Sequence, residues 1–181
     1  NYEIEDSKEI LTVATTRPET LFGDTAICVN PNDERYKNLI NKKAKLPLTD
    51  RLIKIISDDS IDMDFGTGCV KITPAHDFND YKLGKKHNLE FINILNNDGT
   101  FNDNVGDKFR GIGIHQSREL ILTELKNIGL LGKIEDYKTT IPMGERSGEI
   151  IEPLLTDQWF MKMEDLAKPA IDAVKNSNIK F

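Results

Sequence analysis

Residues 65–80 read FGTGCVKITPAHDFND, and this stretch decides how we expect the chain to fold. The glycines predict a turn. The alternation that follows predicts a short strand, with Val70 and Ile72 on one face and Lys71 and Thr73 on the other. A proline then ends the strand, because proline has no N–H to donate to a neighbouring strand.

A helix is predicted directly after this strand. Asp77 is a suitable N-cap for a helix that runs toward His87, and Asp80 falls three residues later in the first turn. Two carboxylates, a lysine and a threonine therefore point toward one strand-to-helix corner, where we place the chemistry. The alternative is that both acids only cap the helix and that His76 only begins it, since no Cys or His lies at metal-ligand spacing.

A second stretch, TTRPETLFGDTA at residues 15–26, favours the functional interpretation. Together with the segment at 65–80, it resembles the two walls of the editing pocket in class I aminoacyl-tRNA synthetases for branched aliphatic amino acids. This large insertion of the family hydrolyses mischarged tRNA. The resemblance covers nearly the whole chain and is closest to the valyl enzymes, because the family's leucyl members lack the GDTA run. It extends to Asn30-Pro31, Arg146-Ser147-Gly148, Glu152-Pro153 and the TDQWF run at 156–160.

Composition sets the bounds on the class of protein. The chain has 181 residues, 38% hydrophobic and 30% charged, which suits one domain, or one domain plus a return segment. We find no signal-peptide pattern or membrane-length apolar run, and we read Cys28 and Cys69 as reduced, buried residues of a cytoplasmic protein. The net charge of −6 argues mildly against nucleic-acid binding as the main task, but it suits a module that handles only the 3′ end of tRNA(Val).

Because the chain begins at Asn1 and ends at Phe181, we expect a piece of a longer enzyme. The resemblance implies an editing domain at residues 1–138 and a return segment toward the synthetase body at 139–181. Neither the HIGH-type nor the KMSKS-type motif of class I synthetases occurs, so aminoacylation is excluded for this stretch. We expect no cofactor or metal in the domain, since ATP and Mg belong to the synthetase body.

The pattern of short apolar runs predicts a mixed, strand-dominated fold. Helices are expected from Asn30-Pro31 through Leu39, from a Ser117 cap to Gly129, and over 163–175, with a break or kink at Pro169. Periodicity does not decide whether the sheet is open or closed. The resemblance implies a β-barrel core with peripheral helices. The predicted strands are 10–16, 25–29, 45–48, 52–56, 91–95, 130–134, 139–142, 150–151 and 154–155.

The family's chemistry follows from a limit on binding. A pocket shaped for valine cannot strongly reject threonine, which is nearly isosteric. Valyl synthetases are the standard example of this limit, since they discriminate against threonine by only about a hundredfold. A second site must therefore accept threonine and exclude valine. A polar group against the side chain achieves this, because valine leaves that group unpaired at a cost of roughly 1–3 kcal/mol.

The resemblance assigns roles to the residues at the corner. Asp80 is expected to hold the α-ammonium of the substrate, and Asp77, with Thr73 in support, to read the threonine hydroxyl, although the two Asp roles can be exchanged. Lys71 and Arg17 supply positive charge near the oxyanion or the terminal phosphate, unless Arg17 only pairs with Glu19. Other residues expected at the pocket are Thr15, Thr16, Thr20, Phe65, Val70 and His76, with Thr20 grouped among the catalytic residues.

No Ser-His-Asp or Cys-His arrangement can be assembled from the three histidines. The expected nucleophile is therefore a bound water, helped by substrate positioning and without a metal. Two other functions stay open from the sequence. One is a non-catalytic module that binds the tRNA 3′ end, and the other is an editing domain of the leucyl or isoleucyl type.

Overall fold

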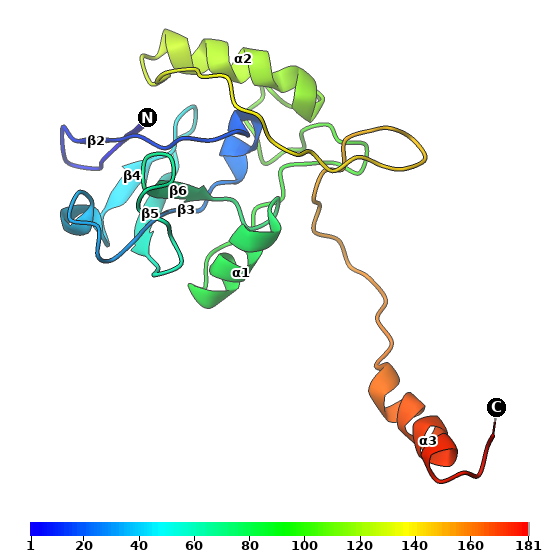
Figure 1. The fold of residues 1–181 in the computed structure, drawn as a ribbon. Helices are drawn as coiled ribbons and strands as arrows, with labels where there is room; N and C mark the ends of the chain where they lie inside the picture. The colour runs from blue at the N-terminus through cyan, green and yellow to red at the C-terminus, as the bar shows by residue number, and fades with distance from the viewer. Residues whose placement is uncertain (181) are drawn as a thin grey trace.

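The computed structural model describes residues 1–180, and a four-stranded sheet lies at the centre of its body (Figure 1). The strand order is β4-β5-β3-β6, with β3 parallel to β5 and the other two pairs antiparallel. The strands are β3 (Ala26–Val29), β4 (Lys43–Lys45), β5 (Leu52–Ser57) and β6 (Cys69–Ile72). β3, β5 and β6 coincide with strands predicted from sequence, whereas β4 begins two residues before the predicted strand 45–48 and shares only Lys45 with it.

The expectation of a closed β-barrel was wrong. The sheet is open, and β4 and β6 form its two edges. Closure needs further strands, but the stretch 91–95 makes only the isolated bridge Leu95–Phe101 although Ile94 is fully buried. Residues 132–151 are almost entirely exposed, so their apolar side chains do not pack against the sheet, and they contribute only the bridge Met143–Ile150. What the structure has is a mixed α/β arrangement.

A two-stranded ribbon lies beside the β4 edge. It consists of β1 (Tyr2–Glu3) and β2 (Ile10–Leu11), and residues 12–16, which were predicted to continue the strand, are not part of it. A bridge joins Ile4 to Ala44 of β4. Three exposed ion pairs, Lys42–Glu9, Lys43–Glu5 and Lys45–Glu3, follow the same seam. The first residues of the chain are therefore anchored to the sheet.

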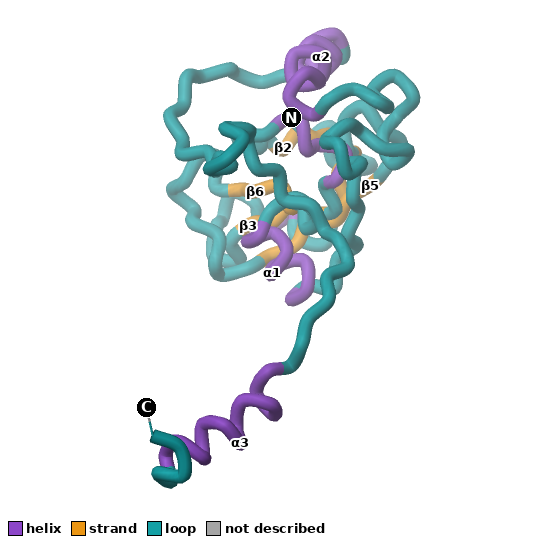
Figure 2. The backbone as a smooth tube through the Cα atoms, turned by 90° about the vertical axis from the view of Figure 1, so that its right-hand side faces the viewer, coloured by secondary structure: helices purple, strands orange, loops and turns teal. Residues whose placement is uncertain are grey.

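Helices cover both faces of the sheet. α1 (Phe78–Lys86) and α2 (Ile114–Asn127) lie on opposite sides of it in two perpendicular views (Figures 1 and 2). This arrangement follows from the alternation of side chains along β3. Ala26 and Cys28 belong to the small apolar cluster on the α1 side, which Leu83 of α1 joins. Ile27 and Val29 belong to the larger cluster on the α2 side. Two short 3₁₀ helices, η1 (Pro18–Gly23) and η2 (Lys37–Leu39), complete the body.

The helix boundaries test the capping predictions. Asp77 caps α1 as predicted. The prediction of Ser117 as an N-cap was wrong, because α2 begins at Ile114 and the buried Ser117 hydroxyl donates to the Ile114 carbonyl at 2.6 Å. Gly129 follows the end of α2 with a φ of +74°, where a side chain would be strained, so its role as terminator is confirmed.

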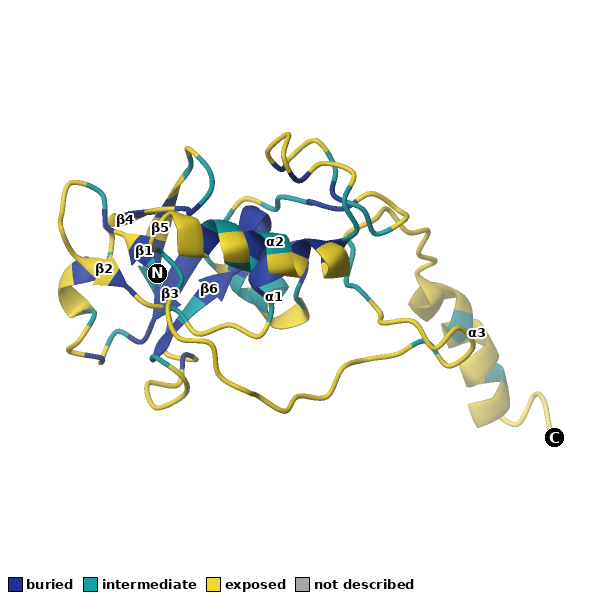
Figure 3. Cartoon of the chain, turned by 90° about the horizontal axis from the view of Figure 1, so that it is seen from above, coloured by how far each residue is buried: buried dark blue, intermediate teal, exposed yellow. Residues whose placement is uncertain are grey.

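The C-terminal part of the chain leaves the body. An extended segment leads to α3 (Met163–Lys175), which projects away from the sheet and is almost wholly exposed (Figure 3). α3 continues through Pro169 without interruption, so the predicted break is absent. The proposed division at residue 139 stays a prediction. Among the described residues, no helix combines the length and the apolar character needed to cross a membrane.

Candidate active site

The corner between β6 and α1 brings together four of the predicted residues. Asp77 accepts hydrogen bonds through Oδ1 from the backbone N–H groups of Asn79 (2.8 Å) and Asp80 (3.0 Å). Asp80 turns back toward the strand, where its Oδ2 accepts the N–H of Thr73 at 2.8 Å. The strand-to-helix turn thus brings Asp80 back to Thr73 and places Asp77 beside Asp80 in the first turn of α1.

Lys71 is buried, at 8% exposure, and all three of its N–H donors are used inside the protein. Its Nζ donates to Thr20 Oγ1 at 2.8 Å, to Asp24 Oδ1 at 2.9 Å and to Thr73 Oγ1 at 2.6 Å. An ammonium has three donors and no acceptor. Direct contact between Lys71 and a substrate therefore requires one of these bonds to be released.

Asp24 is a member of the site that the sequence interpretation missed. Its side chain is 0% exposed and accepts from Lys71, from the Thr73 hydroxyl at 2.6 Å and from the Tyr2 hydroxyl at 2.8 Å. A buried ammonium needs a counter-charge, so Lys71 on a buried strand was the available signal. Choosing Asp24 among the acids required the pairing of β3 with β6, which places Ile27 opposite Lys71.

The two carboxylates at the start of α1 are the site groups with unused bonding capacity. The hydroxyls of Thr20 and Thr73 donate to the Arg17 carbonyl (3.1 Å) and to Asp24, respectively. Within residues 1–180, Asp80 Oδ1 and Asp77 Oδ2 have no hydrogen-bond partner. The arrangement can therefore offer two anionic acceptors to a ligand.

Burial changes the acidity of Asp80. It raises the pKa of this carboxyl to about 6, with Asp77 and Asp24 acting in the same direction and the Thr73 N–H and Lys71 opposing them. The start of a helix favours the anion of a carboxyl, but desolvation has the larger effect on the pKa of Asp80. Asp80 is ionised above about pH 6, where it can bind a cation.

Arg17 is already paired within the protein. Its guanidinium donates to the His76 carbonyl at 2.9 Å and pairs with Glu152, and its Nε lies 3.6 Å from Glu19 Oε1. The alternative of an ion pair with Glu19 is thus present in the structure. Arg17 lies next to the corner, but its charge is compensated by two carboxylates.

His76 is fully buried and serves the fold. Its Nε2 accepts the N–H of Ile94 at 3.0 Å, so Nδ1 carries the proton and donates to the Pro153 carbonyl at 3.1 Å. Burial lowers the pKa of His76 to about 4, which keeps the ring neutral. Both ring nitrogens are occupied within the protein, so a contact between the His76 ring and a substrate would require one of these bonds to be released.

The remaining predicted residues lie at different places around the corner. Phe65 is 63% exposed in the glycine turn before β6. Thr15 and Thr16 are exposed. Thr15 Oγ1 accepts the Arg17 N–H at 3.0 Å, and the Thr16 carbonyl accepts from Arg118 at 2.8 Å. Val70 packs into the cluster on the opposite sheet face from Lys71.

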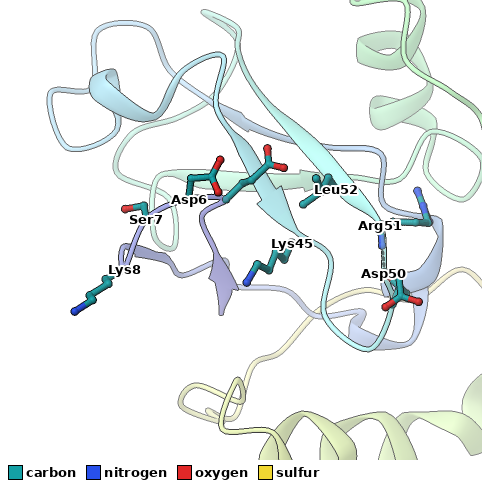
Figure 4. A pocket seen from close by; sticks show the side chains of 9 residues that line it. Asp6, Ser7, Lys8, Lys45, Asp50, Arg51 and Leu52 are labelled. Carbon is teal, nitrogen blue, oxygen red and sulfur yellow. Dashed lines mark hydrogen bonds between the residues drawn. The ribbon is translucent and has the colours of Figure 1, made fainter.

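A cleft of 740 Å³ lies elsewhere, between the β1–β2 and β4–β5 turns (Figure 4). Its walls carry three acids and three bases and include no residue of the corner. Arg51 lines it, but its guanidinium donates to the carbonyls of Phe22 (2.6 Å) and Asp24 (2.7 Å) and so supports η1. Among the described residues, no group of three or more His, Cys, Asp and Glu side chains is placed to hold a metal.

Comparison with known proteins identifies the family. The family model described as "Leucyl-tRNA synthetase, editing domain" matches residues 36–114. Valine--tRNA ligases from Francisella tularensis and Coxiella burnetii are each 53% identical over 180 residues, covering 99% of this chain and 20% of the relative. The chain therefore spans about a fifth of the length of these relatives.

Two solved structures share the fold. One is the LeuRS–tRNA–LeuAMS ternary complex from Agrobacterium radiobacter, with a TM-score of 0.56, 19% identity, and coverage of 70% of this chain and 18% of that chain. The other is GlLeuRS-CP1, with a TM-score of 0.54, 14% identity, and coverage of 70% and 83%. These two structures show the fold alone, whereas the family model and the valine--tRNA ligase relatives show that the chain belongs to the editing domains of class I aminoacyl-tRNA synthetases.

Proposed function

We propose that this chain hydrolyses the aminoacyl ester of Thr-tRNA(Val), releasing threonine that has been attached in place of valine. The observation that carries the proposal is the pair of carboxylates at the start of α1, each with one oxygen free for a ligand. Similarity to valine--tRNA ligases over 99% of the chain supports the choice of tRNA and amino acid. In this role the chain acts in the cytoplasm, on the 3′ end of the tRNA, as part of a longer synthetase that uses ATP and Mg elsewhere.

Asp80 is the proposed anchor for the α-ammonium of the threonyl group. The Thr73 N–H fixes its Oδ2, which leaves Oδ1 to accept a charge-assisted hydrogen bond from the substrate. A partly desolvated carboxylate gains more from a cation than an exposed one does, since surrounding water screens the pair less. The raised pKa of Asp80 is a mark of that desolvation.

Asp77 is the proposed reader of the threonine hydroxyl. Its Oδ1 is occupied by two backbone N–H groups, and Oδ2 is open to accept from the substrate. Valine in the same position would leave this oxygen without its partner, at a cost of roughly 1–3 kcal/mol. This difference corresponds to about fivefold to 150-fold discrimination in favour of threonine, whereas an aminoacylation site built for valine favours valine.

The proposed nucleophile is a water molecule aligned by the bound ester. Lys71 has no free donor, so we assign it two effects: its charge stabilises the oxyanion, and its hydrogen bonds hold Thr20 and Thr73 in place. Phe65 offers an exposed aromatic face for the terminal adenosine. A phosphate that approaches Arg17 has to compete with Glu152 for the guanidinium.

Deacylation assays with Thr-tRNA(Val), Val-tRNA(Val) and Ile-tRNA(Leu) test the proposal. We expect rapid release of threonine and slow release of valine and isoleucine. Fastest hydrolysis of Ile-tRNA(Leu) would assign the domain to the leucyl type. Binding of Thr-tRNA(Val) without hydrolysis, by the full-length polypeptide that contains this chain, would leave only a module that binds the tRNA 3′ end.

A further inference from the structure

Tyr2 reaches the candidate site from the ribbon at the sheet edge. It lies in β1, pairs with Leu11 of β2 and is 4% exposed. Its hydroxyl donates a hydrogen bond to Asp24 Oδ2 at 2.8 Å. Neither the motifs at 15–26 and 65–80 nor the site roles considered above include this residue.

The carboxylate of Asp24 is held from two sides. Oδ1 accepts from Lys71 and from the Thr73 hydroxyl, whereas the Tyr2 hydroxyl is the only hydrogen-bond donor to Oδ2 among residues 1–180. The side chain is 0% exposed, so solvent does not reach Oδ2 to replace a lost partner. A buried carboxylate oxygen without a donor is unfavourable, and the group will turn to find one.

Rotation of this carboxylate affects the rest of the network. The terminal torsion of an aspartate is broad, so hydrogen bonds, and not rotamer preference, set the plane of the group. Lys71 and Thr73 both depend on Oδ1, and Lys71 also holds Thr20. A change in the plane of Asp24 therefore alters the positions of the two threonines and of the ammonium.

We propose that Tyr2 is a positioning residue of the editing site, whose hydroxyl fixes the plane of the Asp24 carboxylate and, through it, the placement of Lys71, Thr20 and Thr73. The inference rests on the proposed function for its effect on catalysis. The β1 backbone is suited to this task, because the bridge Ile4–Ala44 and the ion pair Lys45–Glu3 tie the strand to the sheet that carries Lys71.

Tyr2→Phe tests the proposal, since it removes the hydroxyl and keeps the packed ring. In the full-length polypeptide that contains this chain, we expect kcat for Thr-tRNA(Val) deacylation to fall about tenfold. This is the effect expected from losing one hydrogen bond to a charged group. KM should change by less than about twofold, because Tyr2 does not touch substrate. Tyr2→Phe should add little when it is introduced into Asp24→Asn, since both changes act through the same carboxylate.

Tyr36→Phe is the matched control. The Tyr36 hydroxyl donates to the Thr67 carbonyl at 2.5 Å, and its ring also packs against the main core, but it has no contact with Asp24. We expect this variant to lose a similar amount of thermal stability and to keep its kcat. Equal effects of the two variants on kcat would mean that Tyr2 is merely structural, and the proposal would be overturned.

A measurement without tRNA separates this inference from the proposed function. In the 181-residue chain, the ¹⁵N resonance of the Lys71 ammonium should shift, and its protons should exchange faster, in Tyr2→Phe but not in Tyr36→Phe. An unchanged Lys71 signal with an unchanged kcat rejects the positioning role. A wild-type protein that hydrolyses no aminoacyl-tRNA rejects the proposed function, while the Lys71 signal still reports whether Tyr2 orders the network.

Discussion

Two groups of polar side chains meet at the corner between β6 and α1, and they differ in how far the protein uses their hydrogen-bonding capacity. The first group is the Lys71 network, which comprises Tyr2, Thr20, Asp24, Lys71 and Thr73. In it, all three N–H donors of the ammonium bind acceptors within the protein. In the carboxylate pair of Asp77 and Asp80, one oxygen on each side chain has no partner among the described residues. The first group holds geometry, and the second is available to a ligand.

The two groups also differ in what a substitution removes. Taking one member from a closed, buried network leaves its neighbours unsatisfied, so the fold itself is affected. Taking the charge from a group with a free oxygen removes a ligand contact and leaves the fold nearly intact. The predictions below test this contrast, beginning with the largest effect.

Lys71→Met should cause the greatest loss of stability. It leaves Asp24 as a buried charge without its cation, which typically costs about 3–5 kcal/mol. Urea denaturation measures the free energy of unfolding. Adding Asp24→Asn to Lys71→Met should restore part of the loss, because the amide carries no charge. A cost below about 1 kcal/mol for Lys71→Met would mean that the network is not closed.

Asp80→Asn should nearly abolish deacylation of Thr-tRNA(Val), by about a hundredfold or more, because the neutral amide cannot pair with the substrate ammonium. The amide oxygen can still accept the Thr73 N–H, so the melting temperature should be retained. Single-turnover rates and a melting curve provide the two readouts. Wild-type deacylation by this variant would favour the alternative in which Asp80 only stabilises the helix start.

The activity should depend on pH through Asp80. Its pKa of about 6 predicts that kcat/KM for Thr-tRNA(Val) falls about tenfold per pH unit below that value, since the anchor is protonated. With saturating substrate the midpoint in kcat should lie lower, because the bound ammonium favours the anion. An unchanged profile in Asp80→Asn would assign the titration to another group.

The same shift predicts the dependence of stability on pH. Asp80 holds its proton more tightly in the folded chain than at its ordinary pKa of 3.8. Its contribution to the free energy of unfolding therefore decreases as pH rises from about 4 to about 6, and it is constant above that range. Comparing wild type with Asp80→Asn by urea denaturation across this window isolates the effect.

Asp77→Asn should reduce specificity about tenfold while keeping the helix. The asparagine oxygen still caps α1, but it is a weaker acceptor for the threonine hydroxyl. Hydrolysis of Thr-tRNA(Val) should fall, and that of Val-tRNA(Val) should stay level or rise. Asp77→Ala should change the ratio in the same direction and also lose about 1 kcal/mol of stability with the cap. Parallel loss of both activities, in step with the melting temperature, would leave Asp77 as a cap only.

Glu152→Gln should have the smallest effect. Removing this carboxylate charge frees part of the Arg17 guanidinium for a phosphate, so KM for the tRNA should fall about twofold and its dependence on salt should become steeper. His115→Gln is the control, because it removes the imidazole that lies 3.4 Å from Glu152 without touching Arg17. A rise in KM for Glu152→Gln would mean that Glu152 orients Arg17 for the substrate.

The sequence predicts this corner well because its signals are local. Alternation in 69–73, the absence of an N–H on proline and the capping preference of Asp77 operate within a few residues of one another. These signals place Lys71, Thr73, Asp77 and Asp80 together without knowledge of the sheet. β3 and β5 were predicted for a similar reason, since each carries its own run of apolar residues.

The features that were missed depend on contacts between distant parts of the chain. Tyr2 and Asp24 join the Lys71 network across separations of 22 and 47 residues, which no periodicity reveals. The barrel expectation was wrong because sheet closure depends on which strands pair, and residues 132–151, although they carry apolar side chains, stay exposed and pair with no strand of the sheet. The burial of His76 likewise depends on distant partners, because the Pro153 carbonyl and the Ile94 N–H satisfy its two ring nitrogens.

The stretch Glu152–Pro153 gives the site a mechanical connection. Glu152 is fastened to Arg17, and the Pro153 carbonyl is fastened to His76, the residue directly before Asp77. Just beyond this double attachment, Leu154 packs against the main core and residues 155–157 line a hollow beside Tyr81 and Lys85 of α1, before the exposed chain leads to α3 (Figure 1). A force applied to α3 therefore passes through residues 152–157 to Arg17, to His76 and to α1. The extended segment therefore connects α3 mechanically to the turn that carries Asp77 and Asp80.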